Sequence, residues 1–250
     1  MKAHVSLACW PGLHHENAAR HLDAPPVEPC FGRLSTKHVQ LVPQSAGRLD
    51  DATVERLRQA FPATRFRLHA NVRVQPRHVM ADLSGFTLHA EWFAQAARMS
   101  QRLAASAYSA HAGRRSQATL SEMLDNARRC ADAFSCPVGV EGHYPTPQNT
   151  WLVSSWEEYR TLFESGVPYA LDLSHLHIVA TWSGRREETL VAEMLACERC
   201  LEIHVSANDG RRDRHDVCDA PPWWYALLAG KHPAAVIFSE GNHTHLRSAA

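Results

Sequence analysis

The chain has no net charge, no long apolar run and no regular cysteine spacing. Its 26 lysines and arginines balance 26 aspartates and glutamates, whereas obligate nucleic-acid binders usually show a basic excess or stripe. No stretch approaches the roughly 18 apolar residues of a membrane span, and the first residues, MKAHVSLACWPGLHH, lack an apolar run of signal-peptide length. We therefore expect a cytoplasmic protein for which nucleic acid is not the partner and which contains no membrane span.

The cysteines do not form the pattern of a disulfide framework. There are seven of them, an odd number at irregular spacing, which is typical of a reducing compartment. The single CxxC, from Cys197 to Cys200, has no second pair to complete a zinc site of that type. We therefore look for functional chemistry in other residue types.

The hydrophobic pattern predicts alternating strands and helices. Hydrophobic residues make up 45% of the chain and charged residues 21%, which is an ordinary globular composition. Short apolar runs predict strands at residues 3–8, 38–42, 65–71, 107–112, 137–143, 169–176, 200–206 and 234–241. Amphipathic stretches predict helices at residues 51–60, 90–104, 116–134, 154–164 and 186–197.

This order predicts the fold class α/β, as a single (β/α)8 TIM barrel that occupies residues 1–250 as one domain. A doubly wound open sheet is the alternative. Helix N-caps are expected at Asp50 or Asp51, at Ser116, and at Ser154 or Ser155. The segment after the first strand, with Pro25, Pro26 and Pro29, is too rich in proline for one regular helix and is expected to be a loop that faces substrate.

Histidine is abundant, with 17 in the chain, and several follow the predicted strands together with carboxylates. The carboxyl ends of the strands of a TIM barrel converge on one face, where active sites lie. Nine side chains that can bind metal are therefore expected to meet there: His69, His111, Glu141, Asp172, His175, His204, Asp213, His215 and Glu240.

Each of these residues alone has an ordinary structural explanation, such as a buried histidine bound to a carbonyl group. Together they would place many ionisable groups in one poorly solvated mouth, at a cost of several kcal/mol for each unpaired charge. Metal ions remove that conflict. Five imidazoles and four carboxylates exceed what one tetrahedral ion can bind, so two or three transition-metal ions are predicted, with Fe, Zn or Mn suited to these donors. Glu141 or Glu240 is the expected bridging ligand.

The stretch LEIHVSANDGRRDRHD at residues 201–216 supplies three of these side chains. We expect His204 to leave its strand pointing into the mouth, and residues 208–210 to form a turn. Asp213 and His215 then return on the following loop, where the Asp-x-His spacing predicts two side chains on the same side of an extended segment.

With these residues in place, the sequence resembles the xylose-isomerase-like barrel superfamily, which includes endonuclease IV, sugar isomerases and epimerases, and multinuclear non-heme iron oxidases that modify peptides. The resemblance extends from AHVS at residues 3–6 to FSEG at residues 238–241 and is most specific in HVSANDGRRDRH and ALDLSH. The nine positions together look like the trinuclear ligand set of endonuclease IV.

The segments DVCDAPPWWYALL and SSWEEYRTLFESGVPYALDLSHLHIVAT look most like those of the iron oxidases. Ser174-His175 departs from them, because that group tends to have Asn-Asn there. The resemblance implies O2-dependent oxidation of a peptide or small-molecule substrate at iron, with a partner protein that recognises the peptide. The alternatives are a sugar (phosphate) isomerase or epimerase, and an endonuclease IV-like phosphodiesterase.

Several residues at or near the predicted mouth have expected individual roles. In the isomerase alternative, Glu141 and Glu240 are the catalytic acid–base pair across the substrate. His143 and His177 lie one or two residues beyond ligands and are expected to orient them. Three arginines near the mouth are candidates for binding a substrate phosphate or carboxylate, although each is equally compatible with a solvated surface position: Arg73, Arg114 and Arg211.

Overall fold

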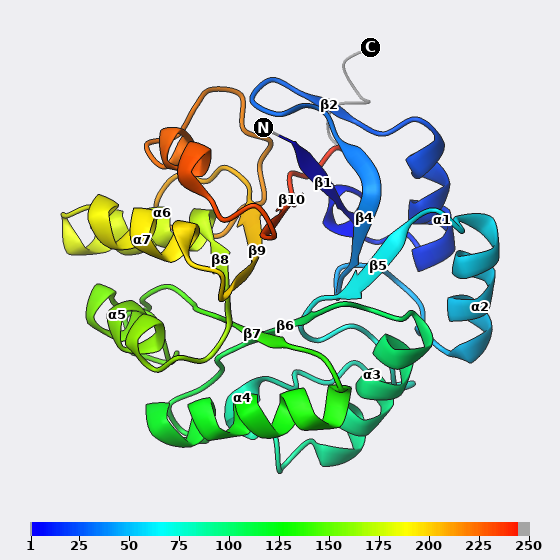
Figure 1. The fold of residues 1–250 in the computed structure, drawn as a ribbon, viewed down its shortest axis with the longest axis horizontal. Coiled ribbons are helices and arrows are strands. Elements are labelled where there is room, and N and C mark those ends of the chain that lie inside the picture. The colour runs from blue at the N-terminus through cyan, green and yellow to red at the C-terminus, as the bar shows by residue number, and fades with distance from the viewer. Residues whose placement is uncertain (1, 245–250) are drawn as a thin grey trace.

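The computed structural model describes residues 2–244, and its centre is a closed barrel of eight parallel strands (Figure 1). The strands are β1 (Ala3–Ser6), β4 (Ser35–Leu41), β5 (Arg65–Leu68), β6 (Tyr108–His111), β7 (Val138–Glu141), β8 (Tyr169–Asp172), β9 (Cys200–Val205) and β10 (Val236–Ser239). The barrel closes where β1 pairs in parallel with β10. This arrangement confirms the predicted (β/α)8 barrel and excludes the open sheet.

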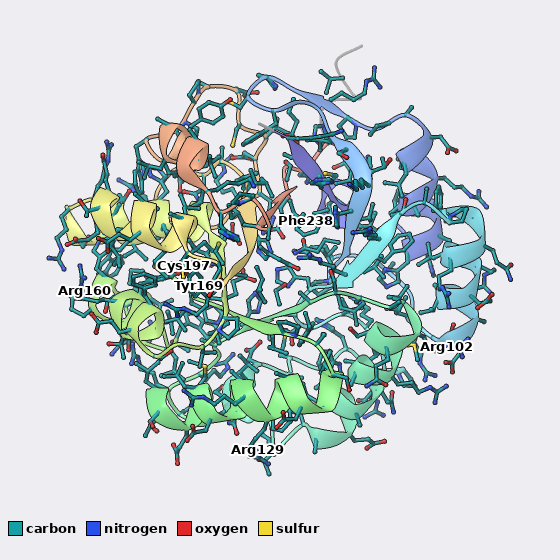
Figure 2. The ribbon with its side chains drawn as sticks, in the orientation of Figure 1. Arg102, Arg129, Arg160, Tyr169, Cys197 and Phe238 are labelled. Carbon is teal, nitrogen blue, oxygen red and sulfur yellow. The ribbon has the colours of Figure 1, made fainter. Side chains whose placement is uncertain are left out.

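Helices surround the barrel, as the ribbon shows in Figure 1. They are α1 (His15–Ala19), α2 (Asp51–Ala60), α3 (Ala90–Arg102), α4 (Leu120–Phe134), α5 (Trp156–Glu164), α6 (Leu173–Ser183) and α7 (Glu188–Ala196), with 3-10 turns η1 (Leu7–Cys9), η2 (Arg20–Asp23), η3 (Leu83–Gly85) and η4 (Tyr225–Gly230). In Figure 2, Arg102 and Arg129 lie at the outer rim, whereas Phe238 lies inside the ring of helices. Within residues 2–244, no helix combines the length and the apolar content that crossing a bilayer requires.

The largest error in a predicted strand end is at β8. The run predicted as a strand to residue 176 leaves the barrel at Asp172, and α6 begins at Leu173. The Asp172 Oδ1 atom accepts hydrogen bonds from the backbone N–H groups of Ser174, at 2.7 Å, and His175, at 3.1 Å. Because this carboxylate caps the helix, His175 lies in the first turn of α6 and not on a strand.

Two of the three predicted helix caps are present. Asp50 and Ser155 accept hydrogen bonds from backbone N–H groups at the starts of α2 and α5. The prediction at Ser116 is wrong, because α4 starts later, at a capping box in which Thr119 and Glu122 each bind the other's backbone N–H. That reciprocal arrangement satisfies two donors that the helix itself leaves free, whereas Ser116 lies in the preceding turn.

As predicted, the proline-rich segment after β1 does not form one regular helix. It contains α1, η2 and a small antiparallel hairpin of β2 (Val27–Glu28) and β3 (Gly32–Arg33). The hairpin buries Glu28, which is 2% exposed.

A polar layer crosses the barrel interior beneath the mouth. The Arg67 Nη1 atom on β5 lies 3.1 Å from Glu202 Oε1 on β9, and both side chains are buried. Because β5 and β9 are not neighbours in the barrel, this ion pair spans its interior. Gln40 on β4 donates to Glu202 Oε2 at 3.3 Å, so the layer supports the site from below.

Candidate metal centre

The structure brings the nine predicted side chains together at the carboxyl ends of the strands. Six of them end or follow the six strands from β5 to β10, and the other three lie in the first turn of α6 and in the loop after β9. Six are almost completely buried: His69, Glu141, Asp172, His175, His204 and Glu240. The remaining three, His111, Asp213 and His215, are half-buried and form the side of the cluster that solvent reaches.

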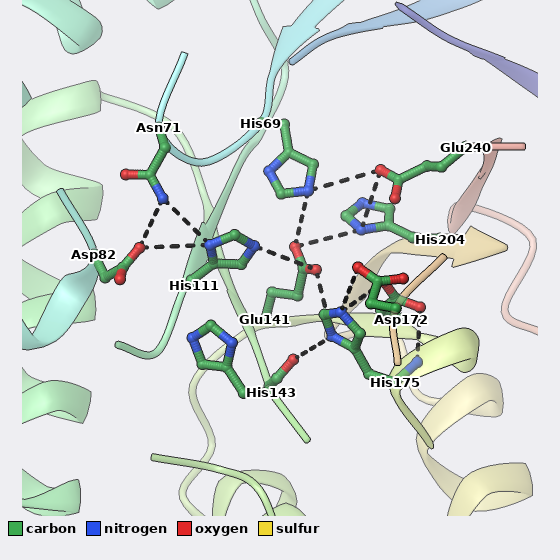
Figure 3. Close-up of polar contacts among 12 residues, drawn as sticks. His69, Asn71, Asp82, His111, Glu141, His143, Asp172, His175, His204 and Glu240 are labelled. Carbon is green, nitrogen blue, oxygen red and sulfur yellow. Dashed lines mark hydrogen bonds and ion pairs between the residues drawn. The ribbon is translucent and has the colours of Figure 1, made fainter. Parts of the chain in front are cut away.

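Glu141 is the centre of one half of the cluster, as Figure 3 shows. Its Oε2 atom lies 3.2 Å from His69 Nε2 and 3.3 Å from His204 Nδ1. Its other oxygen, Oε1, lies 3.7 Å from His111 Nε2. One carboxylate therefore faces three imidazoles from three different strands.

The other half is built around Asp213. Its Oδ2 atom lies 2.9 Å from His215 Nε2 and 3.5 Å from His175 Nε2, and the latter atom is also 3.4 Å from Asp172 Oδ2. Glu240 joins the two halves, because Oε2 lies 3.6 Å from His215 Nδ1 and Oε1 lies 3.7 Å from His69 Nε2.

The loop after β9 returns to the site as predicted, although its backbone differs. Ala207 and Asp216 exchange backbone hydrogen bonds of 2.7 and 3.0 Å, and the Asn208 side chain accepts from Gly210 N–H in the intervening turn. The prediction of an extended backbone is wrong at His215, which has φ 51°. This left-handed residue still leaves its imidazole against Asp213.

Three groups of potential ligand atoms overlap in this cluster. Within each group, one atom per residue lies within 4.8 Å of the others: His69, Glu141 and His204; Glu141, Asp172 and His175; Asp172, His204 and Glu240. Because Glu141, Asp172 and His204 each belong to two groups, the arrangement suits several cations with shared carboxylates better than one isolated cation.

The unpaired polar atoms of the site support the same conclusion. Apart from imidazole–carboxylate contacts of 3.2–3.9 Å, six buried side-chain atoms in the cluster make no hydrogen bond among the described residues: His69 Nδ1, Glu141 Oε2, His204 Nδ1, Asp213 Oδ1, His215 Nδ1 and Glu240 Oε1. Buried polar groups normally make hydrogen bonds, and leaving one without a partner costs free energy. The residues present therefore fit bound metal ions.

Neighbouring groups fix the orientation of two imidazoles. His204 Nε2 contacts Glu202 Oε2 at 3.1 Å and Gln40 Nε2 at 2.8 Å, which leaves Nδ1 facing the cluster. His175 Nδ1 is 2.9 Å from the Gly142 carbonyl oxygen, which leaves Nε2 facing the cluster. This pattern, in which one ring nitrogen binds a protein oxygen and the other faces the ion, is usual for histidine ligands.

Two carboxylates that contact histidines of the cluster, Asp82 and Glu202, were not predicted from the sequence. Asp82 lies 3.4 Å from His111 Nδ1 and accepts a 2.8 Å hydrogen bond from Asn71. It sits in the long loop after β5, where no strand end or motif marked it. Glu202 could have been found, because residues two apart on a strand share a face and it lies two positions before His204.

Without a cation, the catalytic candidates Glu141 and Glu240 differ in protonation. Burial raises the pKa of Glu141, but the His69, His204 and His111 imidazoles outweigh that effect and hold its pKa well below the usual value. Burial raises the pKa of Glu240 to about 7, against the pull of His204 and His215. One carboxylate is thus ionised at neutral pH while the other is close to half-protonated.

Protons also stabilise the half of the site around Asp213. Burial disfavours a charged His175, but Asp172 and Asp213 raise its pKa to about 10. Burial opposes protonation of His215 as well, and its hydrogen bond to Asp213 raises its pKa to about 9. In the cation-free protein, protons on these imidazoles therefore balance the carboxylates.

The two histidines predicted to orient ligands have different surroundings. His143 is buried, stacks on Trp151 with ring centroids 4.5 Å apart, and lies 4.9 Å from the His111 ring. His177 is half-buried and accepts a 3.2 Å hydrogen bond from Trp223 Nε1. His143 therefore lies beside the cluster, whereas the His177 ring is hydrogen-bonded to Trp223.

The three arginines predicted to bind substrate lie in the loops after β5, β6 and β9. Arg114 is exposed and lies 4.7 Å above the Trp151 ring. Arg73 is half-buried, and its Nε atom has no partner among residues 2–244. Arg211 is exposed on the loop after β9, where its backbone N–H donates to Asp209.

The closed barrel of eight parallel strands is a fold that the chain shares with solved structures. The chain is similar to a D-tagatose 3-epimerase-like protein, with 14% identity, a TM-score of 0.68, and 99% of this chain and 94% of the other covered. It is also similar to an AP endonuclease of family 2 from Brucella melitensis, with 14% identity, a TM-score of 0.64, and 97% and 93% covered. A xylose isomerase domain protein from Alicyclobacillus acidocaldarius is 15% identical, with a TM-score of 0.59, and 97% and 90% covered. No family model and no curated protein matches the chain.

Proposed function

We propose that this protein is a multinuclear metal-dependent enzyme, and that the site at the barrel mouth binds two or three transition-metal ions. The observation that carries the proposal is the overlap of three ligand groups that share Glu141, Asp172 and His204. One isolated ion would leave much of this ligand set unused. Six unpartnered buried atoms support the same conclusion.

Iron is the ion that we propose first, with zinc or manganese as the alternatives. The group of His69, Glu141 and His204 has two imidazoles and one carboxylate, which is the donor set of non-heme iron oxygenases. The nine proposed ligands include no cysteine. When bound, iron would supply the activation of O2, the oxidant that accepts the electrons removed from the substrate, and this would make the protein an oxidoreductase.

The chain's own residues would then position ligands and substrate. Glu202 and Gln40 would hold the His204 ring in place, and Glu240 would join the two halves of the ligand set. We propose that Arg114, Arg73 and Arg211 bind anionic groups of a peptide or small-molecule substrate. The proposal includes a partner protein that presents the peptide, action in the cytoplasm, and no nucleic-acid substrate.

A sugar isomerase or epimerase is the second candidate. The specific observation in its favour is that Glu141 and Glu240 both lie against His69, at 3.2 and 3.7 Å, which places two carboxylates in one site for a proton transfer. A similar structure is described as D-tagatose 3-epimerase-like. The similar AP endonuclease gives phosphodiester cleavage as a further outcome to test.

Metal analysis of anaerobically purified full-length protein, with Mössbauer and EPR spectra, tests the proposal. We expect two or three iron ions per chain and O2 consumption when a substrate peptide is added. Zinc or manganese alone, with turnover of a ketose, would replace the oxidase with the epimerase. Zinc alone with cleavage of an abasic DNA duplex would replace it with the phosphodiesterase.

A further inference from the structure

A second group of metal-binding side chains lies outside the nine-residue cluster, where the first and last strands of the barrel meet. Cys9 ends η1, Glu28 lies in β2, and His243 follows β10. Their exposed fractions are 0%, 2% and 7%. One potential ligand atom from each residue lies within 4.8 Å of the others.

The contacts within this group leave part of it unsatisfied. Glu28 Oε1 lies 2.9 Å from His243 Nε2 and accepts a 2.7 Å hydrogen bond from the Ser239 hydroxyl. Glu28 Oε2 is buried and has no hydrogen-bond partner among residues 2–244. The Cys9 thiol makes only a weak, 3.6 Å contact with the Ser239 carbonyl oxygen. A half-satisfied buried carboxylate is costly, so the group has an unused capacity for a cation.

We propose that Cys9, Glu28 and His243 bind one thiophilic divalent cation, of which Zn²⁺ is the best fit, at a site separate from the mouth cluster. Thiolate, imidazole and carboxylate are the three donor types that zinc accepts in proteins. Ligand atoms within 4.8 Å of one another can reach bonds of about 2.0–2.3 Å to a common ion with small movements. A water molecule or the Ser239 carbonyl completes the four positions.

The position of the site assigns it a structural role. The backbone N–H of His243 donates to the Cys9 carbonyl oxygen at 2.9 Å, so the two ends of the described chain are already in contact there. Ala3, His4 and Val5 pair with β10 in the adjacent ladder. A cation held by η1, by the hairpin and by the segment after β10 would fasten the closure of the barrel.

Because this site contains a cysteine, a cation bound there can be observed separately from cations bound at the mouth. Cobalt(II) bound to a thiolate gives an intense sulfur-to-metal charge-transfer band in the near ultraviolet, and the nine residues at the mouth contain no sulfur. We expect full-length protein reconstituted with Co²⁺ to show this band, and Cys9→Ser to lose it together with one cation per chain. Cys136→Ser is the matched control, because that half-buried thiol precedes β7, and it should keep both.

Three further variants make the test independent of folding and of the proposed function. Glu28→Gln and His243→Ala should each bind one cation fewer, so the result does not depend on the cysteine variant alone. His204→Ala should lose cations from the mouth but keep the thiolate band. The proposal is overturned if Co²⁺-loaded wild type shows no such band, or if the band survives in Cys9→Ser.

Discussion

His204 links the metal centre to the polar layer beneath it. The side chain is fully buried, with Nδ1 facing Glu141 and Nε2 facing Glu202. We expect His204→Ala and Asp172→Ala each to remove at least one ion from the mouth, because both residues belong to two ligand groups. Metal analysis of the purified variants measures the loss, and circular dichroism should show a largely intact barrel. Full metal content in both variants would contradict the ligand assignment.

Glu202 gives a stability prediction with a defined pH range. Burial opposes its ionisation, but His204 and Arg67 lower its pKa from 4.5 to about 2. A carboxylate whose pKa is lower in the folded state stabilises the fold above its unfolded pKa, and this contribution is lost as the pH falls through the folded value. The shift corresponds to a stabilisation on the order of 3 kcal/mol.

We therefore expect Glu202→Gln to lower the free energy of unfolding at pH 7, and the difference from wild type to shrink between pH 4.5 and about 2. Urea unfolding at a series of pH values measures it. Glu198→Gln, at an exposed position just before β9, is the matched control and should change little. A difference that is constant with pH would show that the ionised carboxylate is not responsible.

At the scale of secondary-structure elements, the sequence predicted the barrel strands well and the helix starts less well. All eight strands were found, because fully buried parallel strands appear as short apolar runs. The same property caused the error at α6, since nearly every residue of LSHLHIVA is buried and periodicity does not distinguish such a helix from a strand. Asp172 decides the boundary by capping the helix, which is a local contact rather than a pattern.

The capping box of α4 offers a test at this scale. We expect Thr119→Ala to lower the free energy of unfolding by about 1 kcal/mol, because it removes an N-cap side chain, while the metal content stays unchanged. Ser116→Ala is the control, since Ser116 lies in the turn before the helix and is exposed. Chemical denaturation of the two variants separates them. Equal losses would show that the capping box does not stabilise α4.

For the whole molecule, strand order explains why the site was more predictable than its surroundings. Parallel strands in a barrel bring distant residues to one face, so residues at strand ends such as His69 and Glu240 could be grouped from the sequence. Asp82 could not be grouped, because a long loop carries it to His111 and no periodicity fixes the path of such a loop. The Cys9, Glu28 and His243 group was missed for the same reason, since a hairpin and a terminal segment supply two of its members.

Metal loading should release protons. In the cation-free protein, His175 and His215 have pKa values of about 10 and 9, so both are protonated at neutral pH, and a cation must displace those protons to bind. We expect proton release on adding metal at pH 7 to 8, and an apparent affinity that rises with pH up to about 10. Calorimetry in buffers of different ionisation enthalpy measures the release. Binding without it would mean that the cations do not use these imidazoles.

Six of the nine mouth ligands lie at the ends of six successive strands, and Glu240 follows the last of them. No short piece of the chain can therefore hold an ion tightly on its own, and the complete chelate exists only after the polypeptide has folded. The metal content would then depend on the ions available to the folded barrel, and the same chain produced under iron-poor or zinc-rich growth should emerge with a different metal content.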